Sequence, residues 1–202
     1  DTVAENANTE FERIKELAKH SKVVAIGECG LDYFHSKPED MDHQRKLFIQ
    51  HIELANEIKK PLMLHVRNER GETSLARSPL AHNAYQEAIQ ILKHHSKVPA
   101  NFHFFAGTLQ DAKDIVEMGN TMSFTGVLTF ARNYDEIIKN IPLENIMSET
   151  DCPFVAPAPY RGKRNEPGYV IEVVKKIAEI RGEEEGVVVE KLMENARRIF
   201  LK

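Results

Sequence analysis

The segment VVAIGECGLDY, residues 23–33, joins a continuous apolar run to a glutamate, Glu28. Three later segments have the same construction, with an apolar run that leads to a histidine or an aspartate: PLMLHVRN (61–68), ANFHFFAG (100–107) and NIMSETDCPF (145–154). A continuous apolar run is typical of a parallel strand that is covered on both faces. The four segments therefore predict buried parallel strands, and in such folds the chemistry lies at the carboxyl ends of the strands.

Helical patterns separate these strands along the whole chain. Strand and helix alternate five times, which favours a parallel α/β architecture over α+β. The 202 residues suit one α/β barrel, and we expect a single domain over 1–202. Residues 68–77 are polar and predict a long loop. The expected strands are 23–27, 62–66, 101–105, 121–125 and 145–149, and the expected helices are 10–20, 40–59, 79–95, 109–118, 134–140, 168–181 and 187–200.

The composition narrows the class of protein. A formal net charge of −4 excludes a basic coat as the main source of affinity for nucleic acid, although a local basic patch is compatible with it. The only cysteines, Cys29 and Cys152, are far apart in sequence, which indicates reduced thiols and a cytoplasmic protein. No apolar run approaches the ~20 residues that cross a bilayer, so we expect no membrane partner.

Four residues that end or follow the predicted strands have side chains that bind metals: Glu28, His65, His103 and Asp151. Each has an ordinary alternative, because a glutamate can cap a turn or pair with Arg67, and a histidine can be a hydrogen-bonded core residue. The same topological position in four strands favours a shared cation site. Imidazole suits zinc, manganese or iron and carboxylate suits magnesium or manganese, so the metal stays open. We expect Glu149 to support this site.

A second candidate feature is the loop PAPYRGKRNEP, residues 157–167. Three cations and one amide donor, Arg161, Lys163, Arg164 and Asn165, follow the Asp151 strand and suit a grip on phosphate. The alternative interpretation is a solvated charged loop.

Five motifs together resemble those of the TatD-type metal-dependent deoxyribonucleases, which are amidohydrolase-like TIM barrels. The motifs are GECGLDY (27–33), LHVR (64–67), HFFAG (103–107), SETDCPF (148–154) and APYRGKRNEP (158–167). They occur in the order and spacing of the family, and the likeness runs from about residue 10 to the C-terminus.

The resemblance implies a TIM-type barrel that cleaves DNA phosphodiester bonds with metal-activated water. Divalent ions (Mg, Mn or Zn) would be the cofactors, two in a complete site. Glu28 and Asp151 would be catalytic as well as metal-binding, with Asp151 handling the proton of the attacking water, and His65 and His103 would complete the shell of one ion. The residues 161–165 would lie near substrate phosphates, with Arg67 as a further, weaker contact.

The first elements of the family have no counterpart here. The family begins with a strand that ends in a His-x-His pair, and a second strand follows it. We therefore expect a barrel that lacks the first one or two β/α units and is N-terminally incomplete or distorted. Exposed barrel edges would then favour a homo-oligomer. Two alternatives to a deoxyribonuclease stay open: a small-molecule amidohydrolase, and a non-catalytic remnant or binding protein with a degraded metal site.

Overall fold

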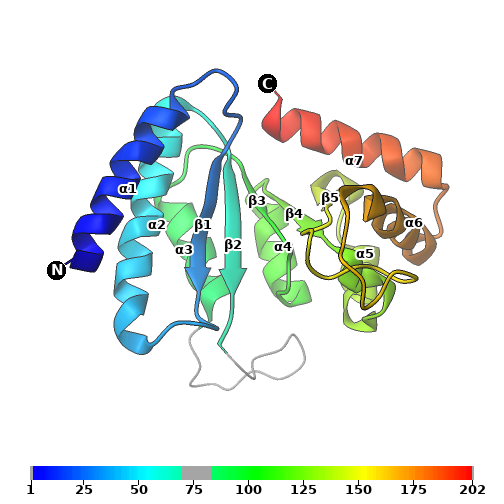
Figure 1. Ribbon diagram of the computed structural model, residues 1–202. Coiled ribbons are helices and arrows are strands. Elements are labelled where there is room, and N and C mark those ends of the chain that lie inside the picture. The colour runs from blue at the N-terminus through cyan, green and yellow to red at the C-terminus, as the bar shows by residue number, and fades with distance from the viewer. Residues whose placement is uncertain (1, 70–82, 202) are drawn as a thin grey trace.

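The computed structural model describes residues 2–69 and 83–201, which form one parallel sheet with helices packed against it (Figure 1). The strand order is β1-β2-β3-β4-β5, and every neighbouring pair is parallel. The prediction of a parallel α/β fold is therefore confirmed. The strands are β1 (Ile26–Asp32), β2 (Leu62–Arg67), β3 (Ala100–Phe102), β4 (Thr121–Phe124) and β5 (Ile146–Ser148).

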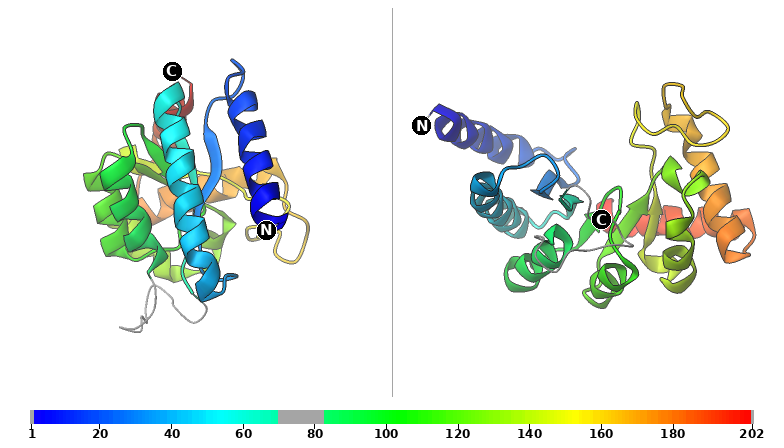
Figure 2. Two further views of the ribbon diagram at one scale, coloured as in Figure 1. Left: turned by 90° about the vertical axis from the view of Figure 1, so that its left-hand side faces the viewer. Right: turned by 90° about the horizontal axis from the view of Figure 1, so that it is seen from below.

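Helices connect successive strands, as in a (β/α) barrel. Seen along the strands, the sheet forms an arc, with α2, α3, α4 and α5 along one side and α6 beyond β5 (Figure 2). From α6, α7 runs back toward the middle of the arc, on the side of the amino ends of the strands (Figure 1). Within the described residues the arc does not close, and β1 and β5 are its outer strands. The helices are α1 (Thr2–Ala18), α2 (Pro38–Ile58), α3 (Ala84–His95), α4 (Leu109–Glu117), α5 (Asp135–Asn140), α6 (Val170–Arg181) and α7 (Glu185–Phe200), with short 3₁₀ turns η1 (Gly126–Thr129), η2 (Arg132–Tyr134), η3 (Leu143–Asn145) and η4 (Pro167–Tyr169).

The first strand differs most from its prediction. It was expected over 23–27 but runs from Ile26 to Asp32, so Glu28 lies inside the strand and not at its end. β1 advances three residues, from Ile26 to Cys29, where β2 advances two, which is the geometry of a β-bulge. Pairing then continues because Gly30 has no side chain: a Cβ there would lie 2.2 Å from the carbonyl oxygen of His65.

Other boundaries differ by a few residues. β3 ends at Phe102, since Phe104 has a positive φ of 44°, and His103 therefore follows the strand. The first helix begins at Thr2, well before the expected residue 10. The third begins at Ala84, where Asn83 caps it by accepting a hydrogen bond from the backbone of Gln86. Most of the predicted loop over 68–77, and residues 79–82 of the predicted helix, lie outside the described residues.

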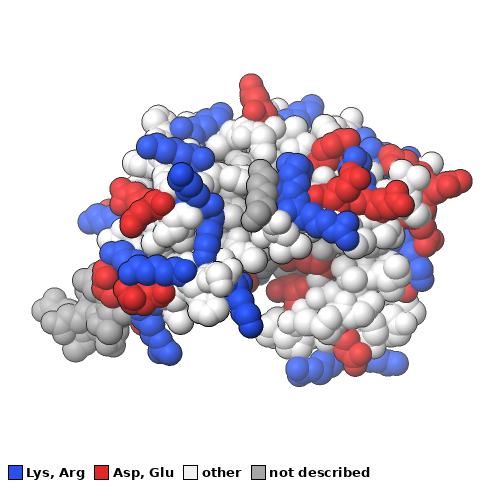
Figure 3. All heavy atoms as spheres, turned by 90° about the horizontal axis from the view of Figure 1, so that it is seen from above, with Lys and Arg blue, Asp and Glu red and all other residues white. Residues whose placement is uncertain are grey.

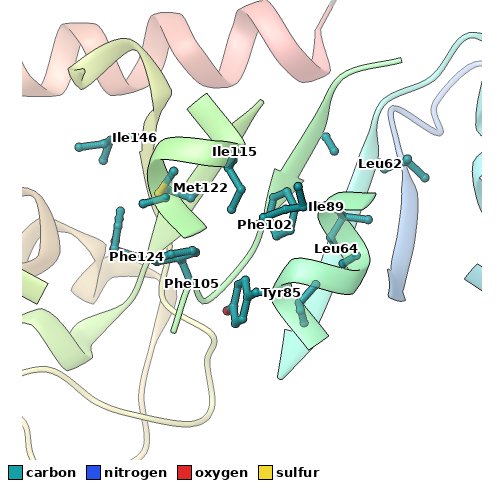
Figure 4. Close-up of a cluster of buried hydrophobic side chains, with 14 of the residues drawn as sticks. Leu62, Leu64, Tyr85, Ile89, Phe102, Phe105, Ile115, Met122, Phe124 and Ile146 are labelled. Atoms are coloured by element: carbon teal, nitrogen blue, oxygen red, sulfur yellow. The ribbon is translucent and has the colours of Figure 1, made fainter. Parts of the chain in front are cut away.

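The core lies between the sheet and the helices of the arc (Figure 4). Tyr85 of α3 packs edge-on against Phe105, with ring centroids 5.2 Å apart, and Phe105 packs against Phe124 of β4 at 5.8 Å. Each fully buried side chain of this size contributes about 1.5–3 kcal/mol of transfer free energy. This packing fixes the central strands, and with them the side chains at their carboxyl ends.

No helix among the described residues is long and apolar enough to cross a membrane.

Candidate metal centre

Three of the four predicted ligands converge: Glu28 within β1, His65 within β2 and His103 just after β3. Nδ1 of His65 lies 3.1 Å from Nε2 of His103, and Oε2 of Glu28 lies 3.3 Å from the same Nε2 and 3.9 Å from Nδ1 of His65. These three atoms form a compact group of two imidazole nitrogens and one carboxylate oxygen. The groups come from parts of the chain as much as 75 residues apart (103 minus 28) and meet only because their strands are neighbours.

The spacing of these atoms fits a cation. Ligand atoms about 2.1 Å from a tetrahedral zinc ion lie about 3.4 Å from one another. The observed separations of 3.1, 3.3 and 3.9 Å bracket that value. Two imidazoles and a carboxylate are also a donor set that zinc and manganese accept. The residues present therefore fit a divalent metal ion.

The sheet register positions the two histidines. Leu64 of β2 pairs with Phe102 of β3, so the next residue of each strand, His65 or the following His103, lies at the same level. The backbone N–H of His103 donates to the carbonyl of Leu64, 3.0 Å away, and extends this pairing by one bond. His103 is 7% exposed, whereas Glu28 is 57% exposed on the bulged strand. The centre thus has a buried side, formed by His103, and an open side, formed by Glu28.

Glu149 supports His103 from the side opposite the cluster. Its Oε2 lies 3.5 Å from Nδ1 of His103, and its Oε1 accepts hydrogen bonds from the hydroxyl of Ser123, at 3.0 Å, and from the backbone N–H of Phe104. Burial lowers the pKa of His103, but the hydrogen bond and charge of Glu149, together with the charge of Glu28, raise it above its ordinary value. Glu149 is therefore placed to orient the imidazole, which is the supporting role expected of it.

Asp151 lies in the turn after β5, with a left-handed φ of 54°. Its carboxyl is not one of the three clustered ligand atoms. Burial raises the pKa of Asp151, and although the charge of His103 lowers it, the charges of Glu149 and Glu28 raise it further. The Asp151 carboxyl is therefore near enough to His103, Glu149 and Glu28 for their charges to act on it. A carboxyl in this position is a candidate for proton transfer.

Asp32 is a further carboxylate beside the cluster, and sequence reasoning missed it. Its Oδ2 lies 3.4 Å from Nε2 of His65 and 2.8 Å from Nδ1 of His35. The residue seemed to fall in a loop because the first strand was expected to end at residue 27. Its position four residues after Glu28 was the available signal, since a strand that continued would place both side chains on the same face.

The predicted phosphate-binding residues have different environments. The guanidinium of Arg161 lies 3.7 Å from the ring centroid of Phe130, and that of Arg67 lies 3.7 Å from the ring centroid of Phe34. Lys163 and Arg164 are exposed, and they form no ion pair within the described part of the chain. The two arginines are therefore held against aromatic rings, while the two other cations extend into solvent.

Asn165 differs from the prediction. It is 2% exposed, and its side-chain amide donates to the carbonyls of Thr150 at 2.8 Å, Phe154 at 2.6 Å and Val155 at 3.3 Å. These bonds fasten the basic loop to the turn that carries Asp151. Asn165 therefore has a structural role. Its side-chain amide is buried and its donors are bonded to backbone carbonyls, so no donor is free for a phosphate.

A parallel α/β fold with a His–His–carboxylate cluster at its carboxyl ends defines a class of metal-dependent hydrolases. The chain belongs to the TatD related DNase family, whose family model matches residues 1–201.

Relatives and solved structures agree with this assignment. The chain is 38% identical over 192 residues to the Bacillus subtilis protein YabD, covering 93% of this chain and 69% of YabD. It is 32% identical over 205 residues to Escherichia coli YcfH, covering 97% of this chain and 69% of YcfH. Both relatives are named uncharacterized metal-dependent hydrolases. The crystal structure of YjjV, a TatD homologue from Escherichia coli, superposes with a TM-score of 0.82 at 26% identity, over 96% of this chain and 71% of that one.

Proposed function

We propose that this protein hydrolyses phosphodiester bonds of DNA with divalent metal ions. The observation that carries the proposal is the cluster of Glu28, His65 and His103, with the carboxyl of Asp151 in the same electrostatic environment. Exposed cations on the adjoining loop provide binding groups of the opposite charge to a phosphodiester.

Glu28, His65 and His103 are the residues that would hold the cation. A divalent ion supplies Lewis-acid polarisation of a phosphoryl oxygen and makes water easier to deprotonate near neutral pH. Asp151 would accept a proton from the attacking water as its oxygen bonds to phosphorus. The leaving oxygen would depart with the bonding electron pair and take a proton from solvent. Asp151 suits this task by its position, since it follows β5 and its carboxyl is within reach of the charges of His103 and Glu28. Glu149 keeps the ring of His103 in place through its contact at Nδ1.

Lys163 and Arg164 are the proposed contacts for the substrate phosphates. They extend from a loop that Asn165 ties to the Asp151 turn, so a phosphate held by the loop lies on the side of the cation site. Arg161 and Arg67 have one face covered by an aromatic ring, and Nη1 of Arg161 also donates to the carbonyl of Ala156 at 3.4 Å. The remaining guanidinium nitrogens are the proposed donors to a phosphate oxygen.

Local cations are needed because the surface as a whole is not basic. On the face that carries the amino ends of the strands, lysines and arginines are interspersed with acidic residues (Figure 3), and the formal net charge is −4. DNA affinity is therefore proposed to arise at the carboxyl-end rim. We place this activity in the cytoplasm, since both Cys29 and Cys152 are free thiols.

The test compares substrates and metals in one set of assays. Wild-type protein is stripped with a chelator, reloaded with Mg²⁺, Mn²⁺ or Zn²⁺, and assayed on a labelled DNA strand, a small phosphodiester and a panel of amides and esters, while bound metal per chain is counted. Metal-dependent cleavage of DNA, lost in His103→Ala, is the expected result. Cleavage of amides alone would establish an amidohydrolase instead, and no cleavage with less than one ion per chain would establish a non-catalytic binding protein.

A further inference from the structure

We infer that Asp32 is a positioning residue for His65: its charge favours a proton on Nε2, so that Nδ1 presents its lone pair to the cation. The contact joins Oδ2 of Asp32 to Nε2 of His65 at 3.4 Å, on the side of the ring opposite the cluster. Nδ1 of the same ring lies in the cluster, 3.1 Å from Nε2 of His103. A neutral imidazole carries one ring proton, so a carboxylate at Nε2 selects the tautomer that leaves Nδ1 free.

The carboxylate of Asp32 is held in place by its own turn. Oδ1 accepts the backbone N–H groups of Phe34, at 2.9 Å, and His35, at 3.3 Å. Oδ2 accepts from the Nδ1 of His35 at 2.8 Å, and the backbone N–H of Asp32 donates to the side chain of Gln44 at 2.8 Å. The two backbone donors at Oδ1 fix the orientation of the carboxylate. Oδ2 therefore points toward His35 and His65.

The second histidine of the cluster has the same arrangement with its nitrogens exchanged. His103 directs Nε2 into the cluster and Nδ1 toward Oε2 of Glu149, 3.5 Å away. Each imidazole therefore lies between the cation site and one carboxylate. Carboxylates in this position orient metal-binding histidines and raise their basicity, and their loss costs about 10–100-fold in metal affinity. The match between the two rings favours a functional role for Asp32 over a chance contact.

The competing interpretation is that Asp32 only stabilises the turn over residues 32–35. The two interpretations predict opposite orders of zinc affinity for two variants, Asp32→Asn and Asp32→Ala. Asp32→Asn keeps an oxygen for the backbone donors of Phe34 and His35, which would place its NH₂ group against Nε2 of His65. Nε2 must then accept, the ring proton moves to Nδ1, and the cation loses a ligand. Asp32→Ala breaks the turn contacts but leaves the ring free to adopt either tautomer.

The experiment measures zinc affinity and the His65 tautomer without any substrate. Zinc dissociation constants are obtained by competition with a chelating dye for wild type, Asp32→Asn, Asp32→Ala and a control, Glu39→Gln, which removes an exposed carboxylate nearby. Ring nitrogens of the zinc-free proteins are followed by long-range ¹H–¹⁵N NMR, with His65 assigned by its own substitution. Thermal unfolding without metal reports the contribution of the turn.

We expect Asp32→Asn to weaken zinc binding about 10–100-fold and to shift His65 to the Nδ1–H form, with Asp32→Ala weakened less. Glu39→Gln should match wild type. The role of Asp32 is overturned if Asp32→Asn binds zinc like wild type, or if Asp32→Ala is the weaker binder of the two. The inference rests on the proposed metal centre and not on the substrate. Wild type that binds no zinc would overturn the centre itself, whereas a zinc-binding protein without nuclease activity would overturn only the proposed substrate.

Discussion

The Nδ1 atom of His65 and the Nε2 atom of His103 lie 3.1 Å apart, although 38 positions separate the two residues in the chain. The parallel register of β2 and β3 produces this proximity, because Leu64 pairs with Phe102 and each histidine continues from that pair. Two unshared electron pairs at this separation repel one another unless a proton or a cation lies between them. A hydrogen bond between the two rings satisfies both nitrogens without metal, and a shared ion would satisfy them when it is bound.

Replacing His103 by alanine should weaken zinc binding at least 100-fold, or about 2.7 kcal/mol, because one of three ligand atoms is lost. A chelator competition assay measures the effect. His94→Ala is the matched control, since His94 is an exposed histidine whose Nδ1 contacts the carbonyl of Gln90 within α3. Equal affinities of His103→Ala and wild type would exclude this residue from the metal centre.

Asp151→Asn should lower turnover of the phosphodiester about 10²–10⁴-fold, the usual contribution of a general acid–base group, and should change zinc affinity less than turnover. Asparagine tolerates the left-handed φ of 54° at this position, so the turn should persist. Turnover under saturating metal and substrate is the measurement. Cys152→Ser, which alters the exposed neighbouring residue, should keep wild-type turnover, and an active Asp151→Asn enzyme would refute the proton-transfer role.

Lys163→Ala combined with Arg164→Ala should raise the KM for DNA and flatten its dependence on salt. Each phosphate contact on a single strand contributes about 0.7 to the slope of log affinity against log salt, so two lost contacts should reduce that slope by about 1.4. Binding of DNA to the Asp151→Asn protein over a salt series gives the slope. Lys139→Ala, an exposed lysine on α5, should leave the slope unchanged. If both variants behave alike, the basic loop does not contact phosphate.

The histidines could be predicted from sequence because local patterns determine where they lie. PLMLH and ANFH each contain an apolar run that must be buried, and parallel burial brings the ends of the runs to one rim. The extension of β1 could not be predicted, because GECGLD has two glycines and two acidic residues and lacks the apolar pattern of a strand. Its pairing depends on close approach to β2, which is a tertiary property. Asp32 was missed for that reason.

Asn165 shows the opposite difficulty. Its neighbours Arg161, Lys163 and Arg164 are charged, so the sequence predicts a loop at the surface. The amide is nevertheless buried, since three backbone carbonyls of the Asp151 turn need a donor and Asn165 supplies it. A polar side chain of a loop is buried where the fold leaves backbone carbonyls without a donor. The local sequence does not indicate where those carbonyls are.

The two cysteines should react at very different rates with a thiol reagent at pH 8. Burial, with the charge of Glu28 as a smaller cause, raises the pKa of Cys29 to about 12, so almost none of it is thiolate. Cys152 is exposed. One equivalent should react quickly in the native protein and two in denaturant, and Cys152→Ser should remove the fast phase. Two fast equivalents in the native protein would show that Cys29 is accessible.

His51 should make stability fall as pH drops below about 6.5. It is 7% exposed, its Nδ1 contacts the carbonyl of Leu47 at 2.8 Å, and its ring lies 5.0 Å from that of Phe11. Burial lowers the pKa of His51 below its ordinary value of about 6.5, although the Leu47 carbonyl opposes the shift. As pH falls through about 6.5, the unfolded chain therefore binds a proton that the folded chain does not, and the free energy of unfolding decreases until pH reaches the lower, folded pKa.

The measurement is urea unfolding at several pH values in the presence of a chelator, for wild type, His51→Gln and the exposed control His94→Gln. His51→Gln lowers stability at every pH through lost packing, so the informative quantity is the difference in its pH dependence. Wild type and His94→Gln should lose more stability between pH 7.5 and 5.5 than His51→Gln does, because only they retain the buried imidazole. An identical pH dependence in all three proteins would mean that His51 is protonated in the folded state as readily as in the unfolded one.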